Sequence, residues 1–309
     1  MKPLVTFAVF SYCDEKYISE SINSVLEQNY ENLEIVISDD HSSDNSYGII
    51  KNIFLNYKGP HKLILNRNKR NLGLPGNWNI VNAMAKGSII IVASGDDISY
   101  PNRVLNTVEA FNRYPNAKIV TGKHDLIDMY GKSIPYQNYD DREIEFSLND
   151  FLKKSTPSVN AATRGYKAEV FKTFGNLDEN GNTEDSPSLL RSLYLGTGVY
   201  IPKLLISYRK HPTSLSSSNN LNEPYLILNK QFKSDLNLAK RAKLIKSEIS
   251  DVEDWIDLRC KRDFIRNKYL KSKNKIIPFF RLILLSKHFQ INDKLNMFKK
   301  IIASYVKND

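Results

Sequence analysis

The stretch Ser88–Ile98, Ser-Ile-Ile-Ile-Val-Ala-Ser-Gly-Asp-Asp-Ile, decides the fold class of this chain. An uninterrupted apolar run, most of it β-branched, ends abruptly in the polar sequence Ser-Gly-Asp-Asp at residues 94–97. Such a run predicts a strand that is buried on both faces, as at the centre of a parallel sheet. Because open α/β sheets bind ligands at the carboxyl ends of their strands, we expect a binding site at Asp96 and Asp97.

Strand and helix patterns alternate on both sides of this stretch. Strands are predicted at residues 4–10, 33–37, 62–65, 118–121 and 199–206, and helices at 15–29, 44–57, 77–86, 101–114, 167–174 and 184–195. Residues 122–165 predict a small antiparallel edge or a loop region. The alternation is typical of an α/β fold, a mostly parallel sheet with helices on both faces. From residue 222 onward only long, Lys-rich helices are expected.

Composition and charge limit the class of protein. The 309 residues are 41% hydrophobic and 25% charged, which is ordinary for a globular chain. Cys13 and Cys260 are too far apart to suggest a disulfide framework or a cysteine metal site. The N-terminus lacks the features of a signal peptide, and no segment approaches the ~20 apolar residues of a membrane span. A cytoplasmic location is therefore expected.

The positive charge is concentrated in the last third of the chain. The net charge is +10, yet residues 203–309 carry 23 Lys and Arg against 10 Asp and Glu. We place a domain boundary in the Ser- and Asn-rich residues 214–224, between a domain at 1–215 and a basic helical region at 216–309. This charge favours an anionic membrane surface as partner, although a solvated lysine-rich surface explains it equally well.

Two segments of the basic region have amphipathic character. A basic stretch at 268–275 precedes an apolar run at 276–285, and residues 295–306 mix aromatic and aliphatic side chains with lysines. Such segments are typical of helices that lie in the membrane interface, so a peripheral location at the inner face of the cell membrane is one expectation. Packing onto the first domain is the alternative. Because no nucleic-acid-binding motif accompanies the charge, no nucleic-acid partner is expected.

Three acidic pairs fall at strand ends or helix starts: Asp39-Asp40, Asp96-Asp97 and Glu184-Asp185. Carboxylates at such positions can accept hydrogen bonds from a nucleoside, share Mg²⁺ with a diphosphate, or act as a general base. Each pair by itself is explained as well by a turn or a helix cap. Three pairs within one α/β unit together favour a binding site.

In its ordered motifs the chain resembles the family 2 glycosyltransferases, which are inverting enzymes of the GT-A fold. The resemblance extends over residues 4–215, and its motifs lie at 6–18, 24–30, 35–44, 71–73, 94–103, 184–185 and 208–211. The GT-A sheet with a C-terminal helical extension is therefore the expected fold. Three positions depart from the family pattern: Cys13 replaces a frequent Asn, Ser94 replaces the first Asp of Asp-X-Asp, and the Gln-x-x-Arg-Trp of processive synthases is absent.

The resemblance also implies a role for each candidate residue. Those expected to contact the nucleotide-sugar donor are Tyr12, Glu15, Asp39, Arg70, Asn71, Asp96 and His211. Asp96 is expected to bind a divalent metal, Mg or Mn, with Asp97 beside it and His211 closing over the diphosphate or the metal. Asp185 is expected to be the catalytic base, with Glu184 as its neighbour.

The expected function is transfer of a sugar, from UDP more readily than from dTDP, to a hydroxyl of a glycan acceptor. A lipid-linked acceptor of bacterial O-antigen, capsule or other polysaccharide biosynthesis fits a non-processive enzyme held at a membrane. Two alternatives are a sugar nucleotidylyltransferase and a non-catalytic protein that binds nucleotide sugars or membrane surfaces. The first would need a Gly-rich phosphate loop after the first strand, and residues 11–15 contain no glycine.

Overall fold

The computed structural model describes residues 2–136, 140–181, 183–212, 214, 225–245 and 249–271. Within the last two helices it describes the side chains of residues 227–245 and 249–261. Residues 215–224, which hold most of the predicted domain boundary, lie outside this part of the chain. So do the apolar segments at 276–285 and 295–306, and their proposed membrane contacts stay predictions.

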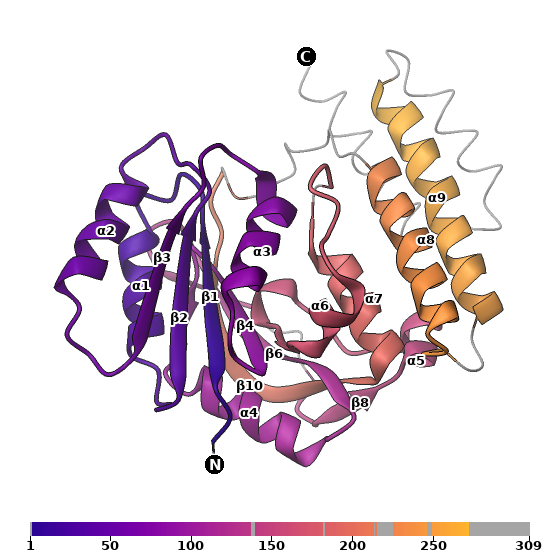
Figure 1. Cartoon of the computed structure of the whole chain (residues 1–309), viewed down its shortest axis with the longest axis horizontal. Helices are drawn as coiled ribbons and strands as arrows, with labels where there is room; N and C mark the ends of the chain where they lie inside the picture. The colour runs from indigo at the N-terminus through magenta and orange to yellow at the C-terminus, as the bar shows by residue number, and fades with distance from the viewer. Residues whose placement is uncertain are drawn as a thin grey trace.

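A single mixed sheet organises the described chain (Figure 1). Its strands are β1 (Val5–Ser11), β2 (Leu33–Asp39), β3 (Lys62–Arg67), β4 (Ile89–Ser94), β5 (Ile98–Ser99), β6 (Ala117–Ile127), β7 (Ser133–Ile134), β8 (Ile144–Phe146), β9 (Gly165–Lys167) and β10 (Thr197–Arg209). The main order is β3-β2-β1-β4-β9-β6-β10-β5, with β7 on β6 and β8 on β10. The pairs β3–β2, β2–β1, β1–β4 and β6–β10 are parallel, whereas β9 runs antiparallel to both of its neighbours.

The central position predicted for the opening stretch is confirmed. β4 lies between β1 and β9, and its side chains alternate between two separate hydrophobic clusters. Ile89, Ile91 and Ala93 belong to one cluster, and Ile90 and Val92 to the other. The run has no polar interruption because both faces of this strand are covered by helices.

Helices cover both faces of the sheet, as the alternation predicts. α1 (Ile18–Leu26), α2 (Ser46–Asn56) and α4 (Arg103–Arg113) contribute to the cluster on one face. α3 (Gly73–Met84), α6 (Glu169–Phe174) and α7 (Asp185–Leu195) contribute to the cluster on the other. α3 begins four residues earlier than predicted. Its Pro75 lies in the first turn, where the missing backbone N–H has no partner within the helix.

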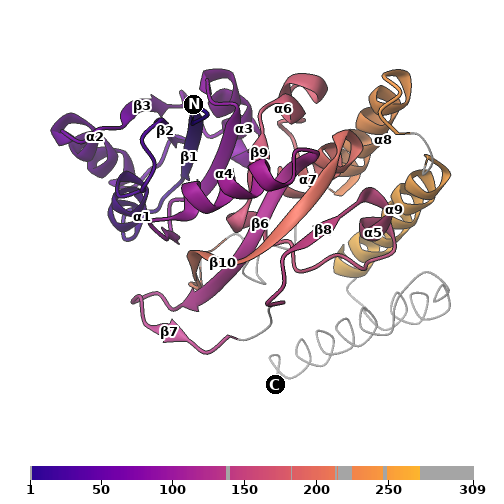
Figure 2. The same ribbon diagram turned by 90° about the horizontal axis from the view of Figure 1, so that it is seen from below.

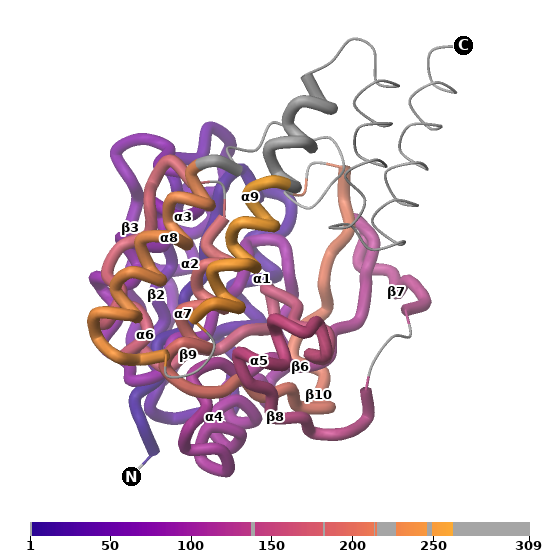
Figure 3. Tube along the Cα trace, turned by 90° about the vertical axis from the view of Figure 1, so that its right-hand side faces the viewer, coloured from indigo at the N-terminus to yellow at the C-terminus, as the bar shows by residue number. Residues whose placement is uncertain are grey.

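The described part of the basic region is a helical hairpin packed on the α/β unit. α8 (Tyr225–Arg241) contacts α7, and α9 (Ile249–Lys271) contacts α8 and α5 (Leu148–Leu152) (Figures 1 and 3). Phe232, Val252 and Ile256 are buried in the same cluster as the β4 side chains Ile90 and Val92. These helices therefore share the hydrophobic core of the first domain, and the division at residue 215 stays a prediction.

Two long strands, β6 and β10, extend the sheet beyond its parallel half (Figure 2). Both are longer than predicted, because polar residues in their distal halves hide a strand pattern: His124 and Asp125 in β6, and Ser207 and Arg209 in β10. The η1 turn (Ala161–Thr163) and β9 occupy residues that were expected to form a loop and a helix start. The short helix α6 ends at Gly175 as predicted, with φ of 69° in the left-handed region.

Candidate active site

The parallel strands β1, β2 and β4 end at the same edge of the sheet, and acidic residues follow β2 and β4 there. Parallel pairing places Ser11 of β1 beside Asp39 of β2, and Phe10 beside Ser94 of β4. The loops that follow these strands therefore emerge side by side. The sheet register thus places the acidic pairs at residues 39–40 and 96–97 at the same edge of the sheet, on either side of β1, although 55 residues or more separate them in the sequence.

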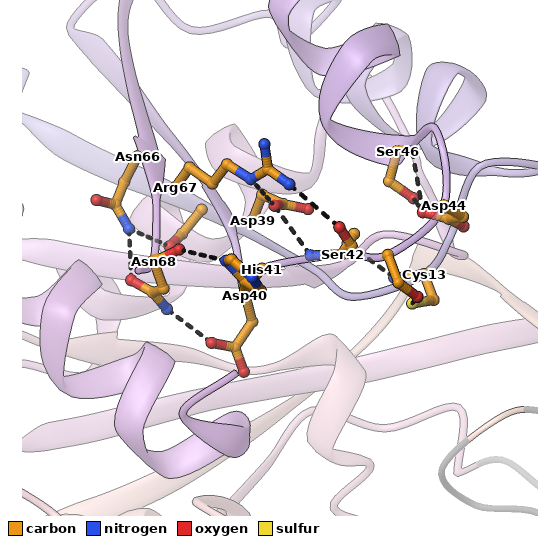
Figure 4. Close-up of polar contacts among 12 residues, drawn as sticks. Cys13, Asp39, Asp40, His41, Ser42, Asp44, Ser46, Asn66, Arg67 and Asn68 are labelled. Carbon is orange, nitrogen blue, oxygen red and sulfur yellow. Dashed lines mark hydrogen bonds and ion pairs between the residues drawn. The ribbon is translucent and has the colours of Figure 1, made fainter. Parts of the chain in front are cut away.

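Asp39 is fully buried and only partly satisfied. Its Oδ2 accepts a hydrogen bond from Ser42 N at 3.1 Å and pairs with Arg67 Nε at 3.3 Å (Figure 4). Its Oδ1 has no hydrogen-bond partner among the described residues. Arg67 also lies over the Tyr47 ring, 4.4 Å from the centroid. A buried carboxylate oxygen without a partner is costly, so it would gain most from an N–H or O–H group of a ligand.

Asp40 differs from its neighbour because its carboxylate binds the loop that leads to α3. Its Oδ1 accepts a hydrogen bond from Asn68 Nδ2 at 2.8 Å (Figure 4). The same oxygen accepts from Leu72 N at 2.9 Å, which fixes the loop before α3. Arg70 and Asn71 of this loop are exposed, and Asn71 Oδ1 accepts from Gly73 N at 2.8 Å. Their expected contacts with the nucleoside stay predictions.

The loop after β1 is joined to the loop before α2. Cys13 N donates to Ser42 Oγ at 2.9 Å, and Glu15 Oε2 accepts from Asn45 N at 3.0 Å. Tyr12 is 51% exposed, and its expected contact with the nucleotide stays a prediction. Cys13 has a φ of 58°. This left-handed conformation suits Asn better than Cys, which is a physical reason for the Asn that many family members carry there.

Asp96 is paired with His211 from the far end of the first domain. His211 Nε2 lies 2.9 Å from Asp96 Oδ2, and both side chains are largely buried. Asp14 lies beside them, because a Cβ on Gly95 would come within 2.3 Å of Asp14 Oδ2. Burial, and then the negative charge of Asp96, raises the pKa of Asp14 to about 7. Sequence reasoning missed Asp14, although Asp14-Glu15 repeats the strand-end acidic pattern of the other motifs.

Asp97 is buried behind Asp96. Its Oδ1 accepts a hydrogen bond from Arg209 N at 2.9 Å, and its Oδ2 has no partner in the described structure. Burial, and then the charge of Asp96, raises the pKa of Asp97 well above its usual range. The side chain thus faces β10. Whether Asp97 also binds a metal stays a prediction.

Asp96 and His211 have the chemistry of a small divalent-metal site. Within the described residues there is no cluster of three His, Cys, Asp or Glu side chains that could hold a metal by themselves. Carboxylate oxygens suit Mg²⁺ and Mn²⁺, and Mg²⁺ usually shares one or two of them with phosphate oxygens. The neutral imidazole of histidine is the commonest metal ligand in proteins. A carboxylate and an imidazole nitrogen at this edge therefore fit a cation whose other ligands come from a diphosphate.

The third acidic pair begins α7. Asp185 is its first residue, and its carbonyl accepts a hydrogen bond from Arg164 Nη1 at 2.7 Å. Arg164 immediately precedes β9, whose Gly165 pairs with Ile91 of β4, so Asp185 is tied to the half of β4 that leads to Asp96. Glu184 is buried, and burial followed by the charge of Asp185 raises its pKa well above the usual range. Glu184 thus lies in a buried environment that disfavours its charged form.

A sequence profile identifies the family that this arrangement fits. The profile described as glycosyl transferase family 2 matches residues 6–175, more than half of the chain. The chain belongs to glycosyl transferase family 2. The resemblance drawn from the acidic motifs is therefore confirmed.

Relatives in this family are known from bacteria. An uncharacterized glycosyltransferase of Rickettsia felis is 36% identical over 135 residues, which make up 43% of this chain and 22% of that protein. The glycosyltransferase RT0329 of Rickettsia typhi, also uncharacterized, is 27% identical over 229 residues, or 72% of this chain and 69% of the relative. The match to the first relative thus spans less than a quarter of that protein's length.

Solved glycosyltransferase structures share the fold. S. aureus TarS 1-349, in complex with UDP-GlcNAc, is 17% identical with a TM-score of 0.63, covering 87% of this chain and 74% of TarS. The mannosyltransferase PcManGT from Pyrobaculum calidifontis, in complex with GDP-Man and Mn²⁺, is 16% identical with a TM-score of 0.59. The match covers 100% of this chain and 87% of PcManGT. The predicted GT-A fold is confirmed. Among the described helices, none combines the length and the apolar composition needed to cross a membrane.

Proposed function

We propose that this family 2 glycosyltransferase moves a sugar from a nucleoside-diphosphate donor to a hydroxyl of a glycan, with inversion at the anomeric carbon. One observation carries the proposal. Asp39 ends β2, and Asp96, paired with His211, follows β4, with β1 running parallel between the two strands. Asp185 begins α7, and its carbonyl accepts a hydrogen bond from Arg164, which precedes β9. In this order they would meet the nucleoside, the diphosphate and the acceptor hydroxyl.

UDP is the proposed nucleotide. The unpartnered Oδ1 of Asp39 can accept a hydrogen bond from the imide N–H of uracil, while Arg67 holds the opposite oxygen of the same carboxylate. The TarS structure that shares this fold contains UDP-GlcNAc. Because PcManGT contains GDP-Man, a guanine nucleotide is the competing donor class.

Asp96 and His211 would hold Mg²⁺ or Mn²⁺ together with oxygens of the donor diphosphate. The cation would neutralise the charge that develops on the leaving nucleoside diphosphate. Arg209 fixes the backbone of this site through its hydrogen bond to the Asp96 carbonyl at 2.8 Å. A site with few protein ligands depends on such fixed geometry, because the protein must orient both groups before the donor arrives.

Asp185 is the proposed general base. It would accept the proton of the acceptor hydroxyl while that oxygen attacks the anomeric carbon, and the nucleoside diphosphate would leave from the opposite face. Glu184 is buried, and burial raises its pKa, so it suits a supporting role better than that of base. Arg164 holds the Asp185 backbone and so orients the first turn of α7.

The acceptor is proposed to be a lipid-linked glycan in the synthesis of a bacterial surface polysaccharide. The basic composition of residues 203–309 supports an approach to an anionic membrane, where such an acceptor would lie. Flotation of the chain with anionic liposomes, with and without residues 268–309, tests the membrane contact. Equal flotation of the two forms would contradict it.

Donor turnover tests the function itself. We would incubate the chain with UDP-, GDP- and dTDP-sugars in Mn²⁺, in Mg²⁺ and in EDTA, and measure thermal stabilisation and release of nucleoside diphosphate. The expected result is metal-dependent stabilisation and turnover with UDP-sugars, and loss of both in Asp96→Ala. Turnover that is unchanged by chelation would contradict the metal role. Absence of any donor binding would contradict the proposed reaction.

A further inference from the structure

Tyr17 contacts both Arg209, the last residue of β10, and His211, two residues beyond it. Its ring centroid lies 4.8 Å from the Arg209 guanidinium carbon and 4.9 Å from the His211 ring centroid. Arg209 and His211 are two positions apart, so in extended chain their side chains point to the same side, whereas Lys210 between them is exposed. Tyr17 itself is half-buried at the residue that precedes α1.

Arg209 is the buried anchor of this arrangement. Its side chain is 2% exposed, and its guanidinium donates to Asp96 O at 2.8 Å, to Asp128 O at 3.3 Å and to the Glu20 carboxylate. Its backbone N–H donates a hydrogen bond to Asp97 Oδ1. Arg209 therefore binds the main chain of the residue whose carboxylate meets His211.

These four residues contact one another in a closed ring. The Asp96 carbonyl contacts Arg209, Arg209 contacts the Tyr17 ring, Tyr17 contacts His211, and His211 contacts Asp96 Oδ2. The ring of contacts joins the loop after β4, the start of α1 and the end of β10. Asp96 and His211 both lie in loops. Because these contacts already restrict both side chains, either side chain would lose less conformational entropy on binding a cation.

We infer that Tyr17 and Arg209 are positioning residues that orient His211 toward Asp96 for divalent-metal binding. The inference rests on the proposed metal-dependent donor binding. Neither residue is assigned a contact with the cation. Tyr17 acts through its ring, so a phenylalanine can replace it. Arg209 acts through a planar group that stacks and donates several hydrogen bonds at once, which a lysine cannot reproduce.

Metal binding without turnover is the decisive measurement. We would titrate Mn²⁺ into the full chain with saturating UDP, follow free Mn²⁺ by electron paramagnetic resonance, and measure the Kd for UDP separately in EDTA. Tyr17→Leu and Arg209→Lys should weaken Mn²⁺ binding by about 10-fold or more, the range seen when outer partners of metal ligands are removed. The Kd for UDP in EDTA should change less than about twofold, and Tyr17→Phe should bind Mn²⁺ like the unaltered chain.

Arg191→Lys is the matched control, because Arg191 is an equally buried arginine that pairs with Asp235 of α8 at a different place. It should lower thermal stability and leave Mn²⁺ affinity unchanged. Equal Mn²⁺ affinity in folded Tyr17→Leu, or equal losses in Tyr17→Leu and Tyr17→Phe, would overturn the inference. If the unaltered chain binds UDP but takes up no Mn²⁺, the metal role falls with the inference. If it binds no nucleotide at all, the proposed donor class is wrong as well.

Discussion

His211 Nε2 lies 2.9 Å from Asp96 Oδ2, although the two are 115 positions apart in the sequence. The pairing of β5 with the distal half of β10 creates this contact, because Ser99 and Ile98 lie opposite Ile206 and Ser207. The chain that follows β4 is thus bound along the strand that leads to His211. The proposed site for the donor diphosphate therefore depends on residues from two distant parts of the chain.

Asp185→Asn should abolish glycosyl transfer and leave nucleotide binding nearly intact. The amide keeps the shape of the side chain but cannot accept the acceptor proton, and general-base catalysis typically contributes about 10²–10⁴-fold to the rate. Single-turnover transfer rates and the Kd for UDP measure the two effects separately. Glu184→Gln is the neighbouring control and should reduce the rate less. A transfer rate within severalfold of the unaltered chain would exclude Asp185 as the base.

Asp39→Asn should weaken UDP binding by about 5-fold to 150-fold, which corresponds to the ~1–3 kcal/mol lost when a buried polar contact is broken. The reason is that the amide removes the negative charge of a carboxylate whose Oδ1 has no partner within the described protein. Isothermal titration with UDP measures the loss. Asp40→Asn is the control, because Asp40 binds Asn68 and Leu72, so this change should affect stability more than UDP affinity. Similar UDP affinities for both variants would contradict the assignment.

Asp14 should make stability fall as the pH rises toward neutrality. Burial, helped by the Asp96 charge, raises the pKa of Asp14 from 3.8 to about 7, so the folded chain binds its proton more tightly than the unfolded chain. Its contribution to stability is complete below about pH 4 and is lost as the pH rises through 7. The change in unfolding free energy caused by Asp14→Asn, measured against the unaltered chain, should therefore be more favourable at pH 8 than at pH 4.

Urea unfolding in EDTA at these two pH values measures the change in unfolding free energy. Glu15→Gln serves as the control, since Glu15 is the exposed carboxylate next to Asp14. It should shift stability by the same small amount at both pH values. The prediction about Asp14 is wrong if Asp14→Asn behaves in the same way as this control.

Asp235→Ala should lower the free energy of unfolding by about 3–5 kcal/mol, because it leaves a buried arginine without its counter-charge. Arg191 of α7 and Asp235 of α8 form an ion pair with side chains 0% and 4% exposed. Since α8 shares the core of the sheet, the unaltered chain should unfold in one transition. In Trp255→Phe the remaining Trp78 reports on the sheet core, and its fluorescence should change together with the far-ultraviolet circular dichroism. Two separated transitions would instead support an independent unit after residue 215.

Local sequence patterns predicted much of the fold. The apolar run at β4 could only be satisfied between two covered faces, and the strand–helix alternation around it required a parallel sheet. Errors occurred where local signals conflict. Pro75 and two neighbouring glycines resemble a loop but lie in the first turn of α3, and the polar half of β6 hides a strand.

The sequence by itself determined the fold class, the family and the acidic residues at the strand ends, because those signals lie within a few residues of one another. Only the tertiary structure decided which of these residues have unfilled bonding capacity and which partners hold them. Asp39 and Asp40 are indistinguishable as a sequence pair, yet one has an unpartnered oxygen and the other anchors α3. The roles of Asp14, Tyr17 and Arg209 depend on contacts between segments far apart in the chain. Periodicity reports which face of an element is buried, but only the packing of the sheet and its loops sets which side chains meet.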